Sequence, residues 1–399
     1  MTLPVIDYRK HRAGRQSLVE YWRLVRLTIG TAVFNAVRIG HKMVLALGPV
    51  RPLEMDRLVV VGFGGIGNHI LLLPALSAIK NAHPHVLLHL AAASQICADL
   101  MAEDPNVDEC SVLDPGWLRS FRLCLKAGRM LAAIHPSAVL VAAGADPVRG
   151  SVMTMLSHAS IRVGEDWRGR AMFYTHAAPV DPNLSELRRN IRLAGLVGGG
   201  EGPGRPCLML KDEEKNSARR LMHDLTGGKT AKILGVHAGS SSEQSWKRWG
   251  LDRFIATVRI VLDRTDMAAV FFLGPDETDL KQSIESARLA RTSVFPCLNG
   301  IRVAAALIGC CDLFLSNDSG LRHLASAQGL PTITVFGPTS EIKNATDNAS
   351  DAIIVEDVVQ CRPCHYTRWF LACGNSMPCL TRVSPERVAE AVVKTLSDQ

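Results

Sequence analysis

A strand, a polar turn, a helix and a second strand follow one another between residues 311 and 339, and this order constrains the fold more than any other feature of the chain. Leu313 to Leu315 is an apolar run typical of a buried parallel strand, and Asn317 to Gly320 has the composition of a turn and helix N-cap. A helix over Leu321 to Gln328 and a strand over Thr332 to Phe336 complete a βαβ unit. The unit predicts a doubly wound α/β domain with a parallel sheet.

The turn of this unit could also bind an anion. The amides of Ser319 and Gly320 would lie at a helix N-terminus, where unpaired N–H groups and the helix dipole attract phosphate. A nucleoside diphosphate is the natural ligand of such a site. The alternative is an ordinary N-cap in a doubly wound domain.

The rest of the chain divides into two series of strands and helices, and 399 residues suit two domains better than one core. The predicted strands are Leu58 to Val61, His85 to Leu90 and Ala138 to Ala142 in the first series, and Ile233 to His237, Ala269 to Leu273, Leu313 to Ser316, Thr332 to Phe336 and Ile353 to Val355 in the second. A helix over Leu184 to Leu196 and a charged segment over Lys211 to Arg220 are predicted to connect them, and Ser384 is predicted to cap a final helix over Pro385 to Leu396. The pattern predicts two Rossmann-like domains.

Composition favours a globular protein of the cytoplasm. Hydrophobic residues make up 47% of the chain, which is ample for two cores. Met1 to Arg15 lacks the apolar stretch of a signal peptide, so the eleven cysteines are expected to be reduced. No stretch reaches the ~18 uncharged apolar residues of a membrane span.

Residues 1 to 57 carry nearly all of the net charge of +7, because they hold ten Lys or Arg against four Asp or Glu. Apolar residues at helical spacing between Leu18 and Leu47 predict one or two amphipathic helices in this segment. Such a helix could lie on an anionic inner membrane, at about 1 kcal/mol per basic residue. It could equally pack on the protein itself or on another subunit. Nucleic acid is not an expected partner, because no recognisable binding module accompanies the charge.

The first predicted strand leads into a glycine loop that also occurs in dinucleotide-binding proteins. Gly62, Gly64 and Gly67 satisfy the G-x-G-x-x-G pattern directly after the strand. That pattern needs an acidic residue at the end of the second strand to hold the ribose, and none occurs before Asp99. An NAD(P)-dependent oxidoreductase is therefore only a remote alternative.

Four ordered segments closely resemble glycosyltransferase family 9, the lipopolysaccharide heptosyltransferases. They are Val59 to Leu76, Gly235 to Ser242 with Trp246 to Trp249, Phe272 to Glu277, and Asn317 to His323 with Phe336 to Thr339. The resemblance implies the GT-B fold, an α/β fold in which two Rossmann-like domains face each other across a cleft. It implies an acceptor domain over residues 57–205, a nucleotide-sugar domain over 206–383 and a C-terminal helix over 384–399, with residues 1–56 as a helical extension outside the resemblance.

The activity implied by the resemblance is inverting transfer of a heptose, with ADP-heptose as the expected donor and no cofactor for catalysis. In the family pattern, donor binding is expected at Ser240, Ser241, Lys247, Glu277, Asp318, Gly320 and His323, and acceptor contacts at Gly64, Gly65 and Gly67. Ser319 is added to the donor site because its amide would lie at the helix N-terminus. Three kinds of acceptor fit this class of enzyme: a lipopolysaccharide core, another glycan, or a protein side chain. A cytoplasmic location is expected, with the inner-membrane surface as a further option.

The chain departs from the family at the position of the general base. The family has Gly-Asp in the first loop, whereas this chain has Gly67 and Asn68, and an amide cannot accept the proton. We favour the hypothesis that Asn68 orients the acceptor while another group takes the proton. The other hypotheses are that His69 is the base, or that the reaction tolerates a weak base. A nucleotide-sugar-binding scaffold protein with weak or no turnover is the alternative function.

Four late cysteines form a compact set within the segment 361–379. Cys361, Cys364, Cys373 and Cys379 have the spacing of a tetrathiolate zinc or iron site. Members of the family that act on autotransporter proteins resemble this chain in having such a metal finger. Four thiolates leave no open position, so the metal would be structural. A reduced, metal-free loop is the alternative.

Overall fold

The computed structural model of this protein describes residues 55–228, 232–356, 358–365, 367, 370, 373 and 376–398. The amphipathic helices predicted between Leu18 and Leu47 lie outside the described residues, as does nearly all of the predicted 1–56 extension.

The first sheet has six parallel strands in the order β3-β2-β1-β4-β5-β6. The strands are β1 (Arg57–Val61), β2 (Leu87–Ala92), β3 (Glu109–Val112), β4 (Ala138–Val141), β5 (Ile161–Asp166) and β6 (His176–Pro179). The strand order changes direction between β1 and β4, so a crevice is expected outside the carboxyl ends of these two strands.

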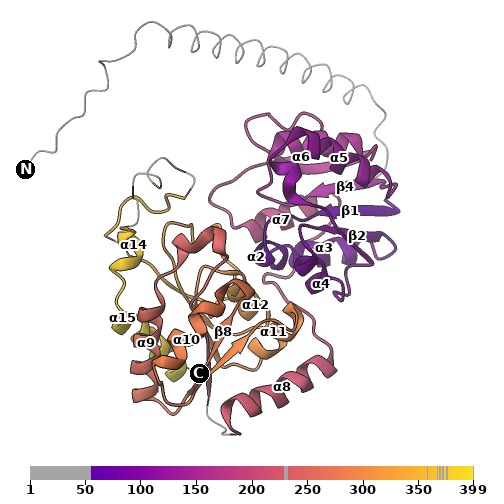
Figure 1. Cartoon of the computed structure of the whole chain (residues 1–399). Coiled ribbons are helices and arrows are strands. Elements are labelled where there is room, and N and C mark those ends of the chain that lie inside the picture. Colours follow the sequence, from indigo (N-terminus) through magenta and orange to yellow (C-terminus); the bar gives the residue numbers. More distant parts are fainter. Residues whose placement is uncertain are drawn as a thin grey trace, which may run out of the picture. The chain divides into compact units, whose positions relative to one another are not determined.

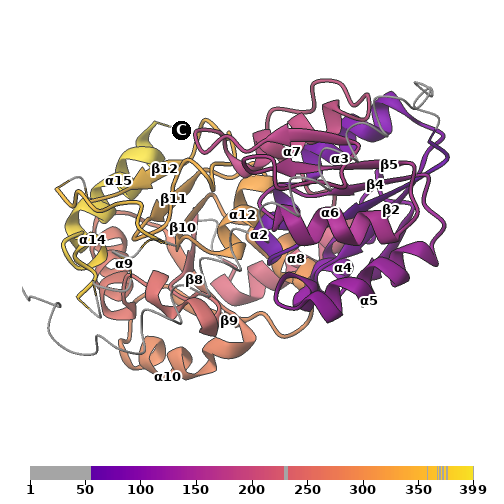
Figure 2. The ribbon, with the colours of Figure 1, turned by 90° about the horizontal axis from the view of Figure 1, so that it is seen from above.

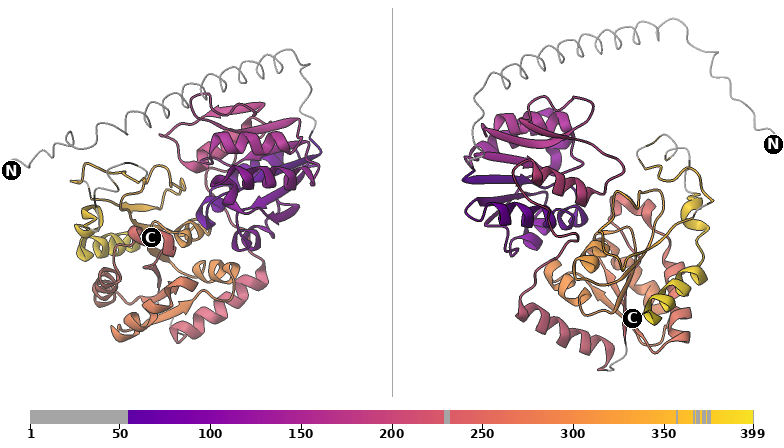
Figure 3. Two further views of the ribbon diagram at one scale, coloured as in Figure 1. Left: turned by 45° about the horizontal axis from the view of Figure 1, so that its top comes forward. Right: turned by 180° about the vertical axis from the view of Figure 1, so that it is seen from behind.

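Helices cover both faces of this sheet (Figures 1 and 3). They are α2 (Ile66–Ile70), α3 (Leu73–Ala82), α4 (Gln95–Met101), the short 3-10 helix η1 (Pro115–Leu118), α5 (Phe121–Ala132), α6 (Pro147–Leu156) and α7 (Glu186–Gly195). Side chains alternate along each strand: Val59 and Val61 are in one apolar cluster with residues of α5 and α6, and Leu58 and Val60 are in another with residues of α3, α4 and α7.

The second sheet repeats this topology, with six parallel strands in the order β12-β11-β10-β7-β8-β9. The strands are β7 (Ile233–His237), β8 (Ala268–Leu273), β9 (Thr292–Pro296), β10 (Leu313–Asn317), β11 (Thr332–Val335) and β12 (Ala352–Ile354). Here the order changes direction between β7 and β10. The predicted βαβ unit is β10, α12 and β11.

Helices around the second sheet pack on it in two groups (Figure 2). The elements are α8 (Asp212–Thr226), η2 (Ser242–Lys247), α9 (Leu251–Arg264), η3 (Pro275–Glu277), α10 (Thr278–Ser286), α11 (Ile301–Ile308), α12 (Gly320–Ala327), α14 (Pro378–Thr381) and α15 (Pro385–Ser397). α9 and α15 share one apolar cluster with Val236 and Leu315, whereas α8, α11 and α12 share the other with Phe314.

The larger apolar cluster contains residues of both sheets, because α2 and α4 contact α12 and α11. None of the helices in the described part of the chain is long and apolar enough to cross a lipid bilayer. The α/β fold class predicted from the sequence is confirmed.

Candidate active site

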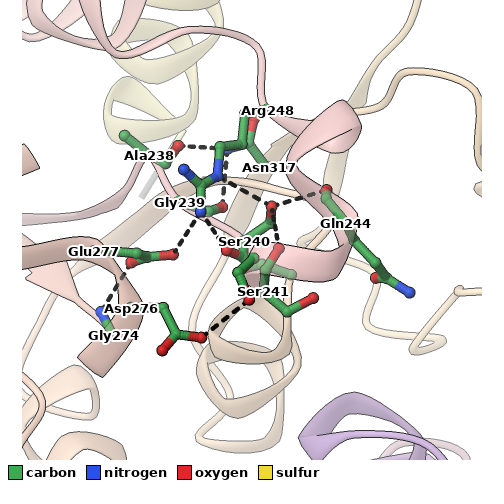
Figure 4. A network of polar contacts seen from close by, with 12 residues as sticks. Ala238, Gly239, Ser240, Ser241, Gln244, Arg248, Gly274, Asp276, Glu277 and Asn317 are labelled. Atoms are coloured by element: carbon green, nitrogen blue, oxygen red, sulfur yellow. Dashed lines mark hydrogen bonds and ion pairs between the residues drawn. The ribbon is translucent and has the colours of Figure 1, made fainter.

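The loops after β7 and β10, the two strands at the switch point of the second sheet, are tied together by Asn317. Its Nδ2 donates to the carbonyl oxygens of Ala238 (2.8 Å) and Gly239 (3.0 Å), and its Oδ1 accepts from the backbone N–H of Trp249 (2.9 Å). Figure 4 shows this amide between the two loops. One side chain therefore fixes the strand ends from which the predicted donor-binding residues extend.

Arg248 holds the loop that carries Ser240 and Ser241 (Figure 4). Its NH2 group donates to the carbonyl oxygen of Ser240 (2.7 Å) and lies 4.0 Å from Oε1 of Glu277. The hydroxyl of Ser240 donates to the carbonyl of Gln244 (3.0 Å), whereas Ser241 is exposed. The guanidinium therefore braces the loop against a carboxylate on the neighbouring η3.

Glu277 is buried in a series of hydrogen-bonded side chains that reaches Ser319, the residue before α12. Its Oε2 accepts from the backbone N–H of Gly274 (2.8 Å) and lies 3.1 Å from Nε2 of His237, whose Nδ1 lies 2.8 Å from the hydroxyl of Ser319. Burial alone would raise the pKa of Glu277, but the hydrogen bond and charge of His237 outweigh it and lower the pKa. A Cβ at Gly239 would lie 1.8 Å from Oε1 of Glu277, so only glycine fits there.

Lys247 and the buried Asp318 form an ion pair next to these hydrogen bonds. Nζ of Lys247 lies 3.2 Å from Oδ2 of Asp318, and Nδ2 of Asn344 donates to the same oxygen (3.0 Å). Burial alone would raise the pKa of Asp318, but the charges of Lys247 and Arg322 outweigh it and keep the pKa below its ordinary value. Arg322 in turn donates to the carbonyl of Asn344.

α12 starts beside this ion pair. Ser319 is its extended N-cap, and its side chain makes no capping bond because the hydroxyl pairs with His237. The helix dipole and the unpaired N–H groups of its first turn therefore add to the positive charge of Lys247. This combination can bind a diphosphate.

His323 on α12 meets the glycine loop of the first sheet. A Cβ at Gly67 would lie 2.6 Å from Cδ2 of His323, so this contact requires glycine. Burial, together with the charge of Arg322, holds the pKa of His323 well below its ordinary value. Within the described part of the chain, its Nδ1 has no hydrogen-bond partner.

On α2, the side chains of Asn68 and His69 point to different surroundings. Oδ1 of Asn68 accepts from the backbone N–H of Gly65 (3.2 Å), and Gly64 adopts a φ of 73° that favours glycine. His69 is fully buried: its Nδ1 lies 3.0 Å from the carbonyl of Gly65, and its Nε2 accepts from the N–H of Ala93 (3.3 Å). Burial lowers the pKa of His69. A neutral ring satisfies both contacts, and neither nitrogen is then left for an acceptor hydroxyl.

Glu186, at the first position of α7, was not predicted from the sequence. Its Oε1 accepts a hydrogen bond from Nδ2 of Asn68 (2.5 Å), although the two residues are 118 positions apart. His237, Arg248, Asn317 and Asn344 were missed as well. His237 and Asn317 could have been found, because each is the last residue of a predicted buried strand or follows it directly.

The four cysteines of segment 361–379 are close enough to influence one another. Burial raises the pKa of Cys379 to about 11, and the thiols of Cys364, Cys373 and Cys361 are among the neighbouring groups that affect it. Among the described residues, no three or more His, Cys, Asp or Glu side chains are arranged to hold a metal ion.

Comparison with known proteins agrees with this architecture. The family described as glycosyltransferase family 9 (heptosyltransferase) matches residues 131–369, which is more than half of the chain. Lipooligosaccharide heptosyltransferase 2 of Campylobacter jejuni is 28% identical over 172 residues, which is 41% of this chain and 51% of that protein. The chain thus spans about half the length of the curated relatives it matches.

Two solved structures share the fold over nearly their whole length. A family 9 glycosyltransferase from Veillonella parvula has a TM-score of 0.69 and 22% identity, with 88% of this chain and 99% of that one covered. ADP-heptose LPS heptosyltransferase II of E. coli has a TM-score of 0.65 and 18% identity, with coverages of 86% and 99%. Their fold is the GT-B-like arrangement of two parallel sheets. Together with the family match, this makes the chain a member of glycosyltransferase family 9, the heptosyltransferase family.

Proposed function

We propose that this protein is an inverting glycosyltransferase that transfers a heptose from ADP-heptose to an acceptor. Membership of the family supports the reaction class. The names of its relatives support the substrates: one refers to ADP-heptose and lipopolysaccharide, and the other to lipooligosaccharide. A glycan of the lipopolysaccharide or lipooligosaccharide core is our proposed acceptor.

The observation that carries this proposal is the pairing of Lys247 with Asp318 beside the N-terminus of α12. In a single displacement the acceptor oxygen attacks the anomeric carbon, and the bond from that carbon to the diphosphate oxygen breaks. The electron pair leaves on the diphosphate, whose growing negative charge needs cations and N–H donors nearby. Lys247 and the first turn of α12 supply both, and this chemistry requires no metal ion. Glu277 and Ser240 would contact the nucleoside and phosphates from the β7 side.

Donor binding and transfer can be tested separately on the full chain. Calorimetry should show that ADP and ADP-heptose bind more tightly than UDP-glucose. ADP release should then depend on an added lipooligosaccharide core acceptor. Binding of ADP-heptose without hydrolysis or transfer to core glycans, other glycans or proteins would favour the scaffold alternative. Failure to bind ADP or ADP-heptose would contradict the proposal.

We also propose that the protein works at an anionic membrane surface, which would suit a lipid-linked acceptor. The supporting feature is the outer face of α5. Phe121, Leu123, Leu125 and Met130 on this helix are 40–52% exposed. Arg122, Lys126 and Arg129 are exposed on the same helix, and no acidic residue occurs between Asp114 and Asp146. Apolar and basic side chains together suit a surface of anionic lipids.

For the four cysteines we propose a structural zinc or iron ion. Burial and the neighbouring cysteines both raise the pKa values of Cys364 and Cys379, the cysteines because negative charges that lie close together repel. A bound cation would instead favour the thiolate forms. Because the described thiols are not already arranged around a common point, the segment would have to close around the ion.

A further inference from the structure

We infer that Glu186 is the group that accepts the proton of the acceptor hydroxyl, and that Asn68 positions it. This inference rests on the proposed glycosyl transfer. The general base that is missing at position 68 would then come from α7, a different element of the same domain.

The backbone brings Glu186 to the switch point of the first sheet. Ser185 caps α7, so Glu186 is the first residue of that helix, and its backbone N–H donates to the carbonyl of Lys343 (2.9 Å). A Cβ at Gly144, in the loop after β4, would lie 3.6 Å from Oε2 of Glu186. The carboxylate therefore lies outside the carboxyl ends of β1 and β4, where ligands bind in sheets of this kind.

The two oxygens of Glu186 have different surroundings. Oε1 accepts from Nδ2 of Asn68, and the backbone N–H of Gly65 donates to Oδ1 of Asn68, which keeps the amide donor turned to Glu186. Oε2 has no hydrogen-bond partner among the described residues, and the side chain is only 1% exposed. The second oxygen is thus a buried acceptor that lies 4.0 Å from the ammonium group of Lys343.

A neighbouring carboxylate shows what a purely structural role looks like. Glu165 accepts two hydrogen bonds from Arg189, at 2.6 and 2.5 Å, and a third from the backbone N–H of Gly144 (2.7 Å). Both of its oxygens are used. Glu186 lies in the same region, but one of its two carboxylate oxygens accepts no hydrogen bond among the described residues. A buried oxygen without a hydrogen bond lowers the stability of the fold, so a purely structural role does not explain it.

Four groups face Glu186 from the elements around it. Lys343, Asn68 and Arg189 favour the charged form, and Glu165 opposes it. Burial is the largest influence, and it raises the pKa of Glu186 above its ordinary value. A carboxylate with a raised pKa is a stronger base, and one that is still ionised at neutral pH can take a proton.

Lys343 lies beside Oε2 and is partly exposed to solvent. Its Nζ lies 4.0 Å from Oε2, and its side chain is 39% exposed. We place the acceptor hydroxyl at Oε2, beside this ammonium group. As the hydroxyl oxygen forms its bond to the anomeric carbon, its proton moves to Oε2, and the electron pair of the breaking bond leaves on the diphosphate.

The test moves the carboxylate from position 186 to position 68. Glu186→Gln keeps the size and the hydrogen bond to Asn68 but removes the base, so transfer should fall about 10²- to 10⁴-fold with unchanged affinity for ADP. Asn68→Asp alone should also lose activity, because it places two carboxylates in contact. The double variant Asn68→Asp/Glu186→Gln returns a carboxylate to the first loop and should recover at least tenfold over Glu186→Gln.

Two further measurements separate a base from a structural residue. The wild-type rate should fall in acid with a limb above the ordinary carboxylate range, and this limb should be absent in Glu186→Gln. Thermal melting at pH 8 should show Glu186→Gln at least as stable as the wild type, whereas Glu165→Gln should be less stable. Glu285→Gln, on an exposed surface pair with Lys281, is the matched control and should leave the rate unchanged.

An unchanged rate in Glu186→Gln would overturn the role of Glu186 while leaving the proposed function intact. A Glu186→Gln protein that melts early and loses ADP affinity would make Glu186 structural, which overturns it as well. If the wild type binds ADP-heptose but transfers nothing to any acceptor, the proposed function and this inference fall together.

Discussion

Buried charges on the donor side are kept ionised by their partners. Asp318 pairs with Lys247, and Glu277 pairs with His237; in both cases burial opposes ionisation, and the partner together with other neighbouring groups lowers the pKa of the carboxyl group. Such pairs are costly to break, because the group that remains is charged and removed from water. In the proposed donor site these residues would already be charged before the ligand binds.

Replacement of Lys247 tests the donor site at the level of one residue. Lys247→Ala should weaken ADP binding by roughly 1.5–3 kcal/mol, the usual size of a lost charge-assisted contact. It should also raise the pKa of Asp318, because the nearest positive charge is gone. Calorimetry with ADP at pH 7 measures the first effect. Lys281→Ala, on exposed α10, is the control, and equal affinities for the two variants would remove Lys247 from the site.

Among the helices, α5 is the one that we propose lies on a membrane surface. Its inner face is formed by Cys124, Ala127, Gly128 and Leu131, which are buried against the first sheet. These inward residues pack the helix against the domain, whereas the apolar side chains on the outer face are exposed and add nothing to this packing. Basic side chains lie among these apolar ones, and this combination would suit a surface of anionic lipid.

Charge reversal on α5 should reduce membrane binding. Lys126→Glu/Arg129→Glu replaces attraction by repulsion, so the full chain should partition at least tenfold less into vesicles containing phosphatidylglycerol, and the difference should shrink as salt is added. Cosedimentation measures this. Lys215→Glu/Arg219→Glu on exposed α8 is the charge-matched control. If both double variants lose binding equally, the attraction reflects net charge and not α5.

The cysteine segment is a second element whose role can be tested. The rings of His365 and Phe370 contact the ring of Trp246, next to Lys247. The centroid distances are 4.4 Å for the tilted His365 pair and 4.8 Å for the edge-to-face Phe370 pair. Metal analysis of protein purified under reducing conditions should find about one zinc or iron per chain. Cys364→Ser or Cys379→Ser should abolish it and weaken ADP binding, whereas Cys207→Ser, at an exposed cysteine outside the segment, should retain it. Metal-free wild-type protein with full ADP affinity would contradict the proposal.

At the scale of the whole molecule, Arg302 joins the two series of strands. Its guanidinium donates to both carboxylate oxygens of Glu214, each at 2.7 Å, and to the carbonyl oxygens of Leu100 and Met209, each at 3.0 Å. Leu100 belongs to α4 of the first sheet, whereas Arg302 lies on α11 of the second. The hydrogen bond to Arg302 and its charge lower the pKa of Glu214 despite partial burial.

Arg302→Ala should therefore lower the free energy of unfolding by about 2–3 kcal/mol at pH 7. A carboxyl group with a lowered pKa contributes stability above its unfolded pKa, about 4.3, and loses it as the pH falls through the folded value. The stability gap between wild type and Arg302→Ala should consequently narrow below about pH 4. Urea unfolding from pH 3.5 to 7 measures it, with exposed Arg220→Ala as control. A gap that stays constant with pH would show that Glu214 is not the relevant partner.

Most of the fold could be predicted from local sequence. Central parallel strands such as β1, β4, β7 and β10 are short apolar runs, because both of their faces are buried. Four strands were missed: β3, β5, β6 and β9. β3, β6 and β9 are edge strands in which most side chains are not fully buried, so they lack an apolar run. β5 carries Arg162, Glu165 and Asp166, and these charged residues interrupt the apolar run by which a central strand is recognised.

The sequence by itself determined the two series of apolar strands, the helix after Asp318 and the glycines that follow the first strand, because each depends on residues that are neighbours in the chain. Only the tertiary structure brought Asn68 to Glu186, and Ser319 to His237 and Glu277. These contacts join residues 40 to 118 positions apart, and no local pattern encodes them. They arise because parallel strands direct all their carboxyl ends to one edge of a sheet, where loops from distant parts of the chain meet.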